Sequence, residues 1–275
     1  MAATETTTGY PYPLAGKTVL VTGGSRGIGE AIVMELARRG ASTVLFTYVT
    51  PRSEARALSI CGAVSALPHR PVARAFRVDL SGLEGAGVLL GEMQKAWGEE
   101  RKGQGDEFGV DVLVNNAGCE RVKALGEIEM EDYDAVYNLN VRGVILLTQA
   151  LLPHLRPHAR VINIGSVGAR TGFKALSLYC SSKAALEGLT RCWAAELGGA
   201  PRCITVNCVN PGPVQSELLD NIPKDIVEGQ KATTPLGNRL GEASEVADVV
   251  AALAGRDGAW VTGQVISVSG GWAMY

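Results

Sequence analysis

The sequence predicts an α/β protein in which one doubly wound parallel sheet of about seven strands carries helices on both faces. Short runs of β-branched and apolar residues alternate along the chain with longer segments of helical period. These runs are continuously apolar, which is typical of strands that are covered on both faces. No internal repeat and no long linker divides the 275 residues, so we expect a single domain.

The strands are expected where β-branched and apolar residues run together, at residues 17–22, 43–48, 73–78, 110–114, 160–164, 204–209 and 264–268. Segments with apolar residues at helical spacing lie between and after them, at residues 27–39, 51–60, 81–97, 130–137, 141–152, 177–197, 217–230 and 243–254. Gly40 is a C-terminal stop for the first helix, and Ser81 is a candidate N-cap for the third. Residues 98–109 are charged and rich in glycine, which indicates an exposed loop.

Composition argues against several classes of protein. The net charge is −2 and no basic block stands out, so no nucleic-acid partner is expected. No apolar run approaches the ~20 residues of a membrane helix, and residues 1–14 lack the basic and apolar pattern of a secretory signal. We therefore expect a flexible arm over residues 1–14, a domain over residues 15–275, no membrane partner and a cytoplasmic location.

Cysteine and histidine usage predicts neither disulfides nor a metal site. The six cysteines are scattered without a CxxC pair, which favours reduced thiols in the cytosol. His154 and His158 stand four residues apart, but Pro153 and Pro157 interrupt any helix that would align them. The three histidines therefore lack the spacing of metal ligands.

A glycine-rich turn follows the first expected strand, with the sequence TGGSRGIG at residues 22–29. Gly23 permits a sharp exit from the strand, while Gly27 and Gly29 let the backbone approach a pyrophosphate. The N-terminus of the following helix offers free N–H groups and a partial positive charge to such an anion. A tight turn without a ligand is the alternative, but the position after the first strand of an α/β pattern favours a dinucleotide.

The end of the second strand indicates which dinucleotide is bound. Folds that bind NAD usually place Asp or Glu there, to accept a hydrogen bond from the ribose 2′-OH. This strand ends at Tyr48 and continues into Val49 and Thr50, so no carboxylate would repel the 2′-phosphate of NADP. Arg26 and Arg52 can attract that phosphate, unless both merely face solvent. The sequence therefore favours NADPH over NADH.

Three residues form a candidate catalytic group. Tyr179 and Lys183 stand four residues apart in an expected helix, so their side chains share one face. The ammonium is expected to lower the pKa of the phenol from ~10, and such a phenol can protonate a carbonyl oxygen as hydride arrives at carbon. Ser166 directly follows the fifth strand, at the edge where parallel strands line a ligand crevice. A surface pair and a turn serine are the alternatives, but the joint placement favours catalysis.

Several motifs together resemble the short-chain dehydrogenase/reductase family, which has a Rossmann-type fold. They are TGGSRGIG, NNAG at residues 115–118, Asn140, Ser166, YxxxK at residues 179–183 and NPG at residues 210–212. Their order and spacing match the family over essentially the whole chain from residue 15 onwards. The chain is most similar to β-ketoacyl-carrier-protein reductases and to fungal naphthol or polyketide ketoreductases. One position departs, because Gly165 stands where many relatives have a second serine.

The resemblance implies a role for each matching residue. Tyr179 would donate the proton, Ser166 would orient the carbonyl, and Lys183 would lower the tyrosine pKa and hold the nicotinamide ribose. Asn140 would anchor a water that links Lys183 to solvent. Asp79 would meet the adenine amino group. The full cofactor site would comprise Gly23, Ser25, Arg26, Gly27, Ile28, Gly29, Tyr48, Asp79, Leu80, Asn116, Ala117, Gly118, Tyr179, Lys183, Pro211, Gly212, Val214 and Ser216.

We therefore expect an NADPH-dependent oxidoreductase of secondary metabolism that reduces an apolar or polyketide-like ketone to a secondary alcohol. The alternatives are oxidation of the alcohol, reduction of a quinone, enone or imine, and a catalytically weak NADP-binding scaffold. Residues 215–238 would form a lid over the substrate. The family implies a homodimer or homotetramer through residues 141–152 and 177–197, and the tail at residues 272–275 is expected to pack at a subunit interface.

Overall fold

The computed structural model describes residues 12–100, 107–215 and 224–275. Within these residues, seven strands form one parallel sheet in the order β3-β2-β1-β4-β5-β6-β7. The chain moves outward from β1 in one direction, then returns and moves outward from β4 in the other, which is the doubly wound Rossmann topology. The predicted fold class is confirmed. The strands are β1 (Thr18–Val21), β2 (Thr43–Tyr48), β3 (Val72–Arg77), β4 (Val110–Asn115), β5 (Leu155–Ile164), β6 (Thr205–Pro211) and β7 (Val265–Val268).

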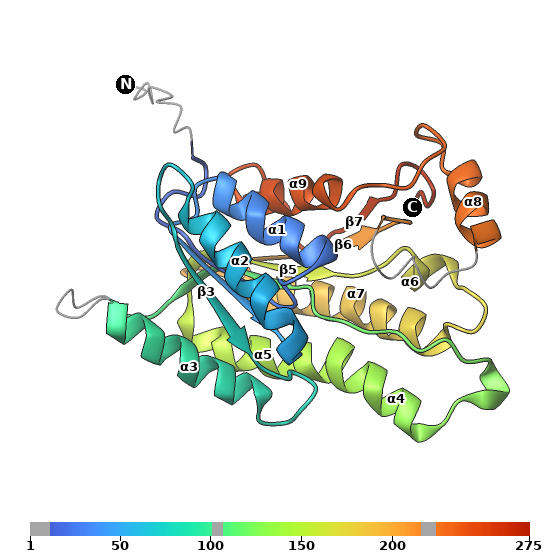
Figure 1. Ribbon diagram of the computed structural model, residues 1–275, viewed down its shortest axis with the longest axis horizontal. Coiled ribbons are helices and arrows are strands. Elements are labelled where there is room, and N and C mark those ends of the chain that lie inside the picture. Colours follow the sequence, from blue (N-terminus) through green and yellow to red (C-terminus); the bar gives the residue numbers. More distant parts are fainter. Residues whose placement is uncertain (1–11, 101–106, 216–223) are drawn as a thin grey trace.

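Helices cover both faces of the sheet (Figure 1). Helices α1, α2 and α9 pack on one face, and α3, α5 and α7 pack on the other. The helices are α1 (Gly27–Arg38), α2 (Glu54–Ser65), α3 (Gly85–Glu100), α4 (Met130–Tyr137), α5 (Val144–Leu151), α6 (Gly168–Thr171), α7 (Ser177–Leu197), α8 (Lys224–Thr233) and α9 (Ala243–Ala254).

The two-sided core explains why the strands read as continuous apolar runs. Val19 and Val21 of β1 pack towards α1, whereas Leu20 between them packs towards α3. Successive side chains of a strand point to opposite faces, so every position is buried when both faces are covered. All described positions of β1, β2, β4 and β6 are buried in this way.

Several boundaries differ from the prediction. Helix α3 begins at Gly85 rather than at residue 81, because the Ser81 hydroxyl donates to the Asp79 carboxylate instead of capping a helix. A short 3-10 turn over residues 51–53 precedes α2, and β5 begins at Leu155, five residues earlier than predicted. Helix α8 is described from Lys224 onwards. Residues 216–223, which include part of the predicted helix and lid, lie outside the described residues.

The predicted helices at residues 130–137 and 141–152 form one continuous helical run, Met130–His154. A π-helical turn, Asn138–Gly143, joins α4 to α5, and such turns are frequent at functional sites. Among the described helices, this run is the one that is long and apolar enough to cross a membrane by length and composition. Leu147 and Leu151 are fully buried against the sheet, so packing inside the domain accounts for its apolar character.

The chain is already packed in the domain at Leu14, which the sequence assigned to the arm. Its side chain is 1% exposed, and its N–H donates to the Arg39 carbonyl over 3.0 Å. Residues 1–11 lie outside the described part of the chain.

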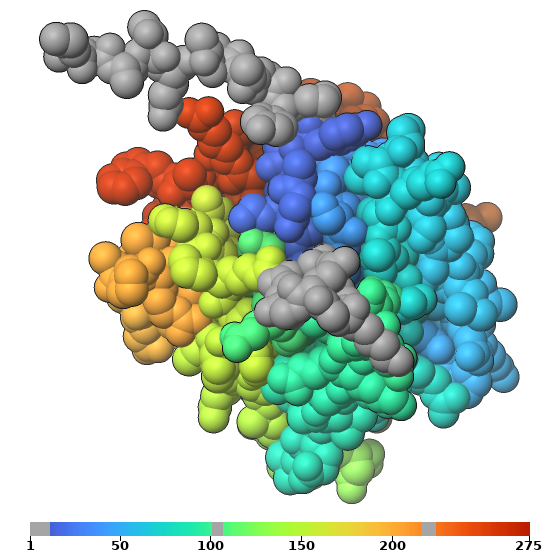
Figure 2. Space-filling model, turned by 90° about the vertical axis from the view of Figure 1, so that its left-hand side faces the viewer, coloured from blue at the N-terminus to red at the C-terminus, as the bar shows by residue number. Residues whose placement is uncertain are grey.

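Because the sheet is parallel, all strands begin at one end of the molecule and finish at the other. Figure 2 looks at the end where they begin, and the segment before β7 (red) projects there. This segment carries Trp260, whose side chain is 99% exposed. The predicted functional residues follow the strands instead, so they gather at the opposite end.

Candidate active site

Four strands of the sheet deliver the predicted site residues to one edge. The glycine turn follows β1, Asn116 follows β4, Ser166 lies just beyond β5, and Gly212 follows β6. The crevice beyond the carboxyl ends of such strands, beside the switch in strand order between β1 and β4, is where ligands bind in open α/β sheets.

The glycine turn has a backbone that larger residues would disturb. Gly23 and Gly27 have φ angles of +65° and +55°, in the left-handed region that favours glycine. A Cβ added to Gly29 would lie 2.1 Å from the Gly23 carbonyl oxygen, so only glycine fits between the turn and the first turn of α1. These constraints agree with the roles that the sequence predicted for the three glycines.

Asn116 holds this turn against the end of β4. Its side-chain Nδ2 donates to the backbone oxygens of Thr22 and Gly23, over 2.9 and 3.1 Å. In return, the Thr22 hydroxyl oxygen accepts from the N–H groups of Asn116 and Ala117, over 3.0 and 2.9 Å. The Asn116 amide therefore fixes the shape of the turn. The sequence pattern predicted the neighbourhood of Asn116 but not this bonding to Thr22.

The N-terminus of α1 fits the pyrophosphate of a dinucleotide. Arg26, at the N-cap, is extended, and its side chain makes no capping hydrogen bond. The first N–H groups of the helix have no carbonyl partner within the helix, so they are available to an anion. Ser25 is buried in the turn, whereas Arg26 is exposed, as is Arg52 beyond β2.

Tyr179, Ser166 and Lys183 come together as predicted. Tyr179 and Lys183 lie one turn apart on α7, with Lys183 Nζ 5.8 Å from the centroid of the Tyr179 ring. The Tyr179 and Ser166 side chains are joined by a hydrogen bond. Lys183 is 4% exposed, and its Nζ donates to the Ile164 carbonyl oxygen over 2.8 Å. The proximity inferred from the four-residue spacing is therefore present, and the catalytic roles of these residues stay a prediction.

The pKa that the sequence argument expected for Tyr179 is wrong for this structure. Burial raises the pKa of Tyr179 to about 12, although the hydrogen bond with Ser166 acts in the opposite direction. Burial also lowers the pKa of Lys183 to about 8. Both shifts arise mainly because removal from water disfavours the charged form of a group. At neutral pH the phenol is protonated and can serve as a proton donor.

Asn140 lies in the π-helical turn, and its side chain is completely buried. Its Oδ1 accepts from the Cys119 N–H over 2.9 Å, and its Nδ2 donates to the Cys119 carbonyl over 2.9 Å and to Ser182 Oγ over 3.0 Å. The side chain therefore fixes the segment after β4, and the water-anchoring role that the resemblance implies for Asn140 stays a prediction. A Cβ on Gly118 would lie 3.2 Å from both Asn140 Oδ1 and Lys183 Nζ. A side chain at position 118 would therefore crowd both Asn140 and Lys183.

The departure at Gly165 has a steric reason. A Cβ added to Gly165 would lie 2.0 Å from Asn210 Oδ1 and 2.8 Å from Cys208 Sγ. Both residues belong to the neighbouring strand β6, and both are completely buried. A serine at position 165 has no room in this core.

The remaining predicted cofactor residues differ in how they are placed. The Tyr48 side chain packs in the core beneath α1 and α2, and Leu80 is buried in the core beneath α3. The exposed Asp79 carboxylate accepts from the Ser81 N–H over 2.9 Å. Ile28 is half-buried in the turn, whereas Pro211 and Val214 are buried. The Gly212 N–H donates to the Val268 carbonyl. Ser216 lies outside the described residues.

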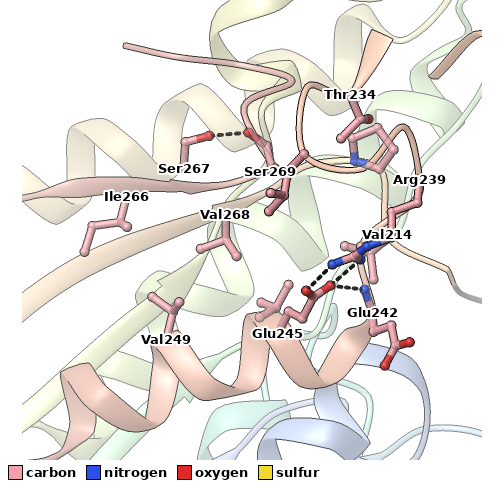
Figure 3. Close-up of a pocket in the computed structure, with 15 residues that line it drawn as sticks. Val214, Thr234, Arg239, Glu242, Glu245, Val249, Ile266, Ser267, Val268 and Ser269 are labelled. Carbon is pink, nitrogen blue, oxygen red and sulfur yellow. Dashed lines mark hydrogen bonds and ion pairs between the residues drawn. The ribbon is translucent and has the colours of Figure 1, made fainter. Parts of the chain in front are cut away.

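A pocket of about 280 Å³ lies between β7, α9 and the segment after β6 (Figure 3). Val214 lines it together with Val249 and Val268, and a two-point ion pair between Arg239 and Glu245 stands at one side. None of the predicted catalytic residues lines this pocket. Among the described residues, no group of His, Cys, Asp and Glu side chains is arranged to hold a metal ion.

Comparison with known proteins identifies related sequences and structures. Residues 23–273 match the family described as enoyl-(acyl carrier protein) reductase. The short-chain dehydrogenase/reductase FrzI of a Cladobotryum species is 38% identical over 95% of this chain and 97% of its own length. The hydroxynaphthalene reductase-like protein Arp2 of Metarhizium brunneum is 37% identical over 98% of this chain and 99% of its own.

A solved structure is also similar along nearly the whole chain. It is a blue fluorescent protein from a metagenomic library, in complex with NADPH. It has a TM-score of 0.82 and 38% sequence identity, and the match covers 95% of this chain and 100% of the other. The family match spans the glycine turn from Gly23 onwards and the positions of Asn140, Ser166, Tyr179 and Lys183.

Proposed function

The chain belongs to the short-chain dehydrogenase/reductase family, and we propose that it uses NADPH to reduce a ketone to a secondary alcohol. The observation that carries this proposal is the convergence of Tyr179, Ser166 and Lys183 beside the glycine turn. Tyr179 is hydrogen-bonded to Ser166, and Lys183 Nζ lies 5.8 Å from its ring. Reduction of a carbonyl requires a proton donor and a group that orients the oxygen, and these side chains supply both.

The protonation state of the site suits reduction. With a pKa of about 12, Tyr179 keeps its proton at neutral pH. An alkoxide is a much stronger base than a phenolate, so Tyr179 can protonate the oxygen as the ketone is reduced. Ser166 donates to the same oxygen and orients it. The hydride itself is the chemistry that NADPH supplies when bound.

Three observations support NADPH as the cofactor. Tyr48 at the end of β2 and the two residues after it carry no carboxylate, so the position from which an acid usually repels a 2′-phosphate is neutral. Arg26 and Arg52 are exposed near the same corner of the sheet and can attract the phosphate. The similar blue fluorescent protein was solved in complex with NADPH.

We further propose an apolar ketone with more than one ring as the substrate class. Phe173 and Leu176 are half-buried between Ser166 and Tyr179, while Val167 is buried beside them. The relative Arp2 is described as hydroxynaphthalene reductase-like. The proposal extends to a homodimer or homotetramer acting in the cytoplasm, in secondary metabolism. Alcohol oxidation, reduction of a quinone, enone or imine, and an inactive NADP-binding scaffold are the outcomes against which it is tested.

The test is consumption of NADPH by the purified protein with a panel of ketones, quinones, enones and imines. Tyr179→Phe should lower kcat for the ketone at least about 100-fold with little change in NADPH affinity, because only the proton donor is lost. Tyr133→Phe is the matched control, since Tyr133 is 40% exposed on α4 and belongs to none of the predicted catalytic or cofactor residues. Unchanged turnover in Tyr179→Phe would disprove the catalytic assignment. Tight NADPH binding without turnover of any substrate would favour the scaffold.

A further inference from the structure

A polar cluster around the buried Glu187 carboxylate continues the catalytic face of α7, and its Arg170 side chain is 35% exposed. Glu187 lies four residues beyond Lys183 and eight beyond Tyr179, so the three side chains share one stripe of the helix. Glu187 is 6% exposed. Arg170 of α6 donates from Nε to both Glu187 carboxylate oxygens, over 3.1 and 2.9 Å. Asn210 of β6 donates from Nδ2 to Glu187 Oε1 over 2.8 Å.

The same cluster holds the last residue of the chain. Asn210 Nδ2 donates to the Tyr275 hydroxyl oxygen over 2.7 Å. The Arg170 guanidinium carbon lies 4.2 Å from the centroid of the Tyr275 ring, a close cation–π contact. The Ala273 carbonyl accepts from the hydroxyls of Ser267 and Ser269, over 2.8 and 3.1 Å. The tail therefore docks on its own chain, and the packing at a subunit interface that the sequence suggested stays a prediction.

Trp272 lies on the substrate side of this anchor. Its ring centroid is 5.6 Å from that of Phe173, and its indole N–H donates to Thr233 Oγ1 of α8 over 3.0 Å. The Phe173 ring packs on Gly168, where an added Cβ would approach it to 3.0 Å. The Gly168 N–H in turn donates to Ser166 Oγ over 3.1 Å. Gly168 and Phe173 therefore connect the catalytic serine to Trp272 through direct contacts. Figure 1 shows the C-terminus near α6 and α8.

The chemistry of the anchor indicates that it specifies a position. The ion pair joins a buried carboxylate to a guanidinium side chain that is 35% exposed, so hydration of the charges offsets much of their attraction and the pair gives little net stability. Here each partner of the pair lies on an element next to a catalytic residue, since α6 begins two residues after Ser166 and α7 holds Tyr179. Asn210 directly precedes Pro211 and Gly212, two of the predicted cofactor residues. The cluster therefore fixes the tail relative to the reacting groups.

We propose that Trp272, held in place by the docking of Tyr275 on Arg170, Glu187 and Asn210, forms a wall of the substrate site that selects aromatic or multi-ring ketones. This proposal rests on the proposed function and deepens it. Trp272 is half-buried, so one part of its indole packs on Phe173 while another part stays available. An aromatic ketone would stack on that surface, whereas a small aliphatic ketone would reach Ser166 and Tyr179 without touching it.

The test compares two ketones, bicyclic 1-tetralone and small butane-2,3-dione, in the full-length protein. Trp272→Ala should raise KM for 1-tetralone about tenfold with kcat changed less than twofold, and should leave butane-2,3-dione and NADPH kinetics unchanged. Tyr275→Phe keeps the ring on Arg170 but loses the hydrogen bond, so the rise should be about threefold to fivefold. Met274→Ala is the matched control, because that side chain of the same tail is 80% exposed. Equal effects on both ketones, or a lower Tm with unchanged kinetics, would overturn the proposal.

A binding measurement separates this proposal from the proposed function. Calorimetric titration with 1-naphthol in the presence of NADP needs no turnover. The Kd should rise about tenfold in Trp272→Ala and stay at the wild-type value in Met274→Ala. If the wild-type protein binds 1-naphthol, the Trp272→Ala variant binds it more weakly, and neither ketone is reduced, then the proposed reaction is refuted but the role of Trp272 in binding is supported. If the wild-type protein does not bind it, or the variants bind it equally well, the wall is refuted whatever the turnover.

Discussion

Replacing Lys183 with methionine is expected to stabilise the folded protein at neutral pH, although it removes a catalytic residue. Lys183 is 4% exposed, and burial lowers its pKa from 10.5 to about 8. At ~1.4 kcal/mol for each pKa unit, the charged form costs the fold about 3 kcal/mol. Methionine carries no charge but leaves the Ile164 carbonyl without its hydrogen bond from Nζ, which costs about 1 kcal/mol. We expect a net gain of about 2 kcal/mol in the free energy of unfolding.

This gain should depend on pH in a defined direction. Between pH 8 and pH 10.5, the unfolded chain binds a proton that folded Lys183 has released. The contribution of Lys183 to the free energy of unfolding therefore rises with pH in this window. The methionine variant lacks this titration, so its advantage over the wild-type protein should shrink by about 2 kcal/mol between about pH 7 and about pH 9.5.

Urea unfolding followed by far-ultraviolet circular dichroism measures both quantities. The wild-type protein and Lys183→Met are compared at four pH values across that range. Lys95→Met is the control, because Lys95 is exposed on α3 and its ammonium stays hydrated. A difference in stability that does not change with pH would refute the reasoning. So would a variant that is less stable than the wild-type protein at neutral pH.

Three further substitutions test the frame of the site. Gly29→Ala should abolish tight NADPH binding in a fluorescence titration and lower the free energy of urea unfolding by about 1–3 kcal/mol, because its Cβ would lie 2.1 Å from a carbonyl oxygen. The control is Gly91→Ala, which has open space around it and should be neutral or stabilising. Equal behaviour of the two variants would contradict this prediction. Asn140→Ala should lower the free energy of unfolding by about 3 kcal/mol, since three buried hydrogen bonds are lost. A decrease below about 1 kcal/mol would show that these hydrogen bonds do not hold the segment after β4. Gly165→Ser should lower Tm, because the new side chain would overlap with that of Asn210. An unchanged Tm would show that β6 can move enough to accommodate the serine.

The parts of the fold that depend on local chemistry were predictable. The strands of a covered parallel sheet must be apolar at every position, and the runs at β1, β2 and β4 have that character. The positive φ angles of Gly23 and Gly27 are open to glycine and strained for other residues, so the turn is visible in the sequence. The four-residue spacing of Tyr179 and Lys183 fixes their common face once the helix is recognised.

The parts that depend on distant partners were not predictable in the same way. Gly165 is explained by Asn210, which lies on another strand 45 residues later. The three hydrogen bonds of Asn140 depend on a π-helical turn that brings the Asn140 side chain to Cys119. The sequence pattern did not predict that turn. The direction of the Tyr179 pKa also failed, because spacing reveals the neighbouring charge but not the loss of water around the phenol.

That failure bears on the direction of the proposed reaction. Reduction of a ketone consumes a proton, and Tyr179, with a pKa of about 12, holds one at neutral pH. Oxidation of an alcohol needs a base instead, and the burial that raises the pKa opposes the phenolate. Lys183, with a pKa of about 8, gains and loses a proton near neutral pH beside the same ring, so it is suited to restoring the proton that Tyr179 gives up. The protonated phenol of Tyr179, with the titratable amine of Lys183 beside its ring, therefore supports reduction as the direction that we propose.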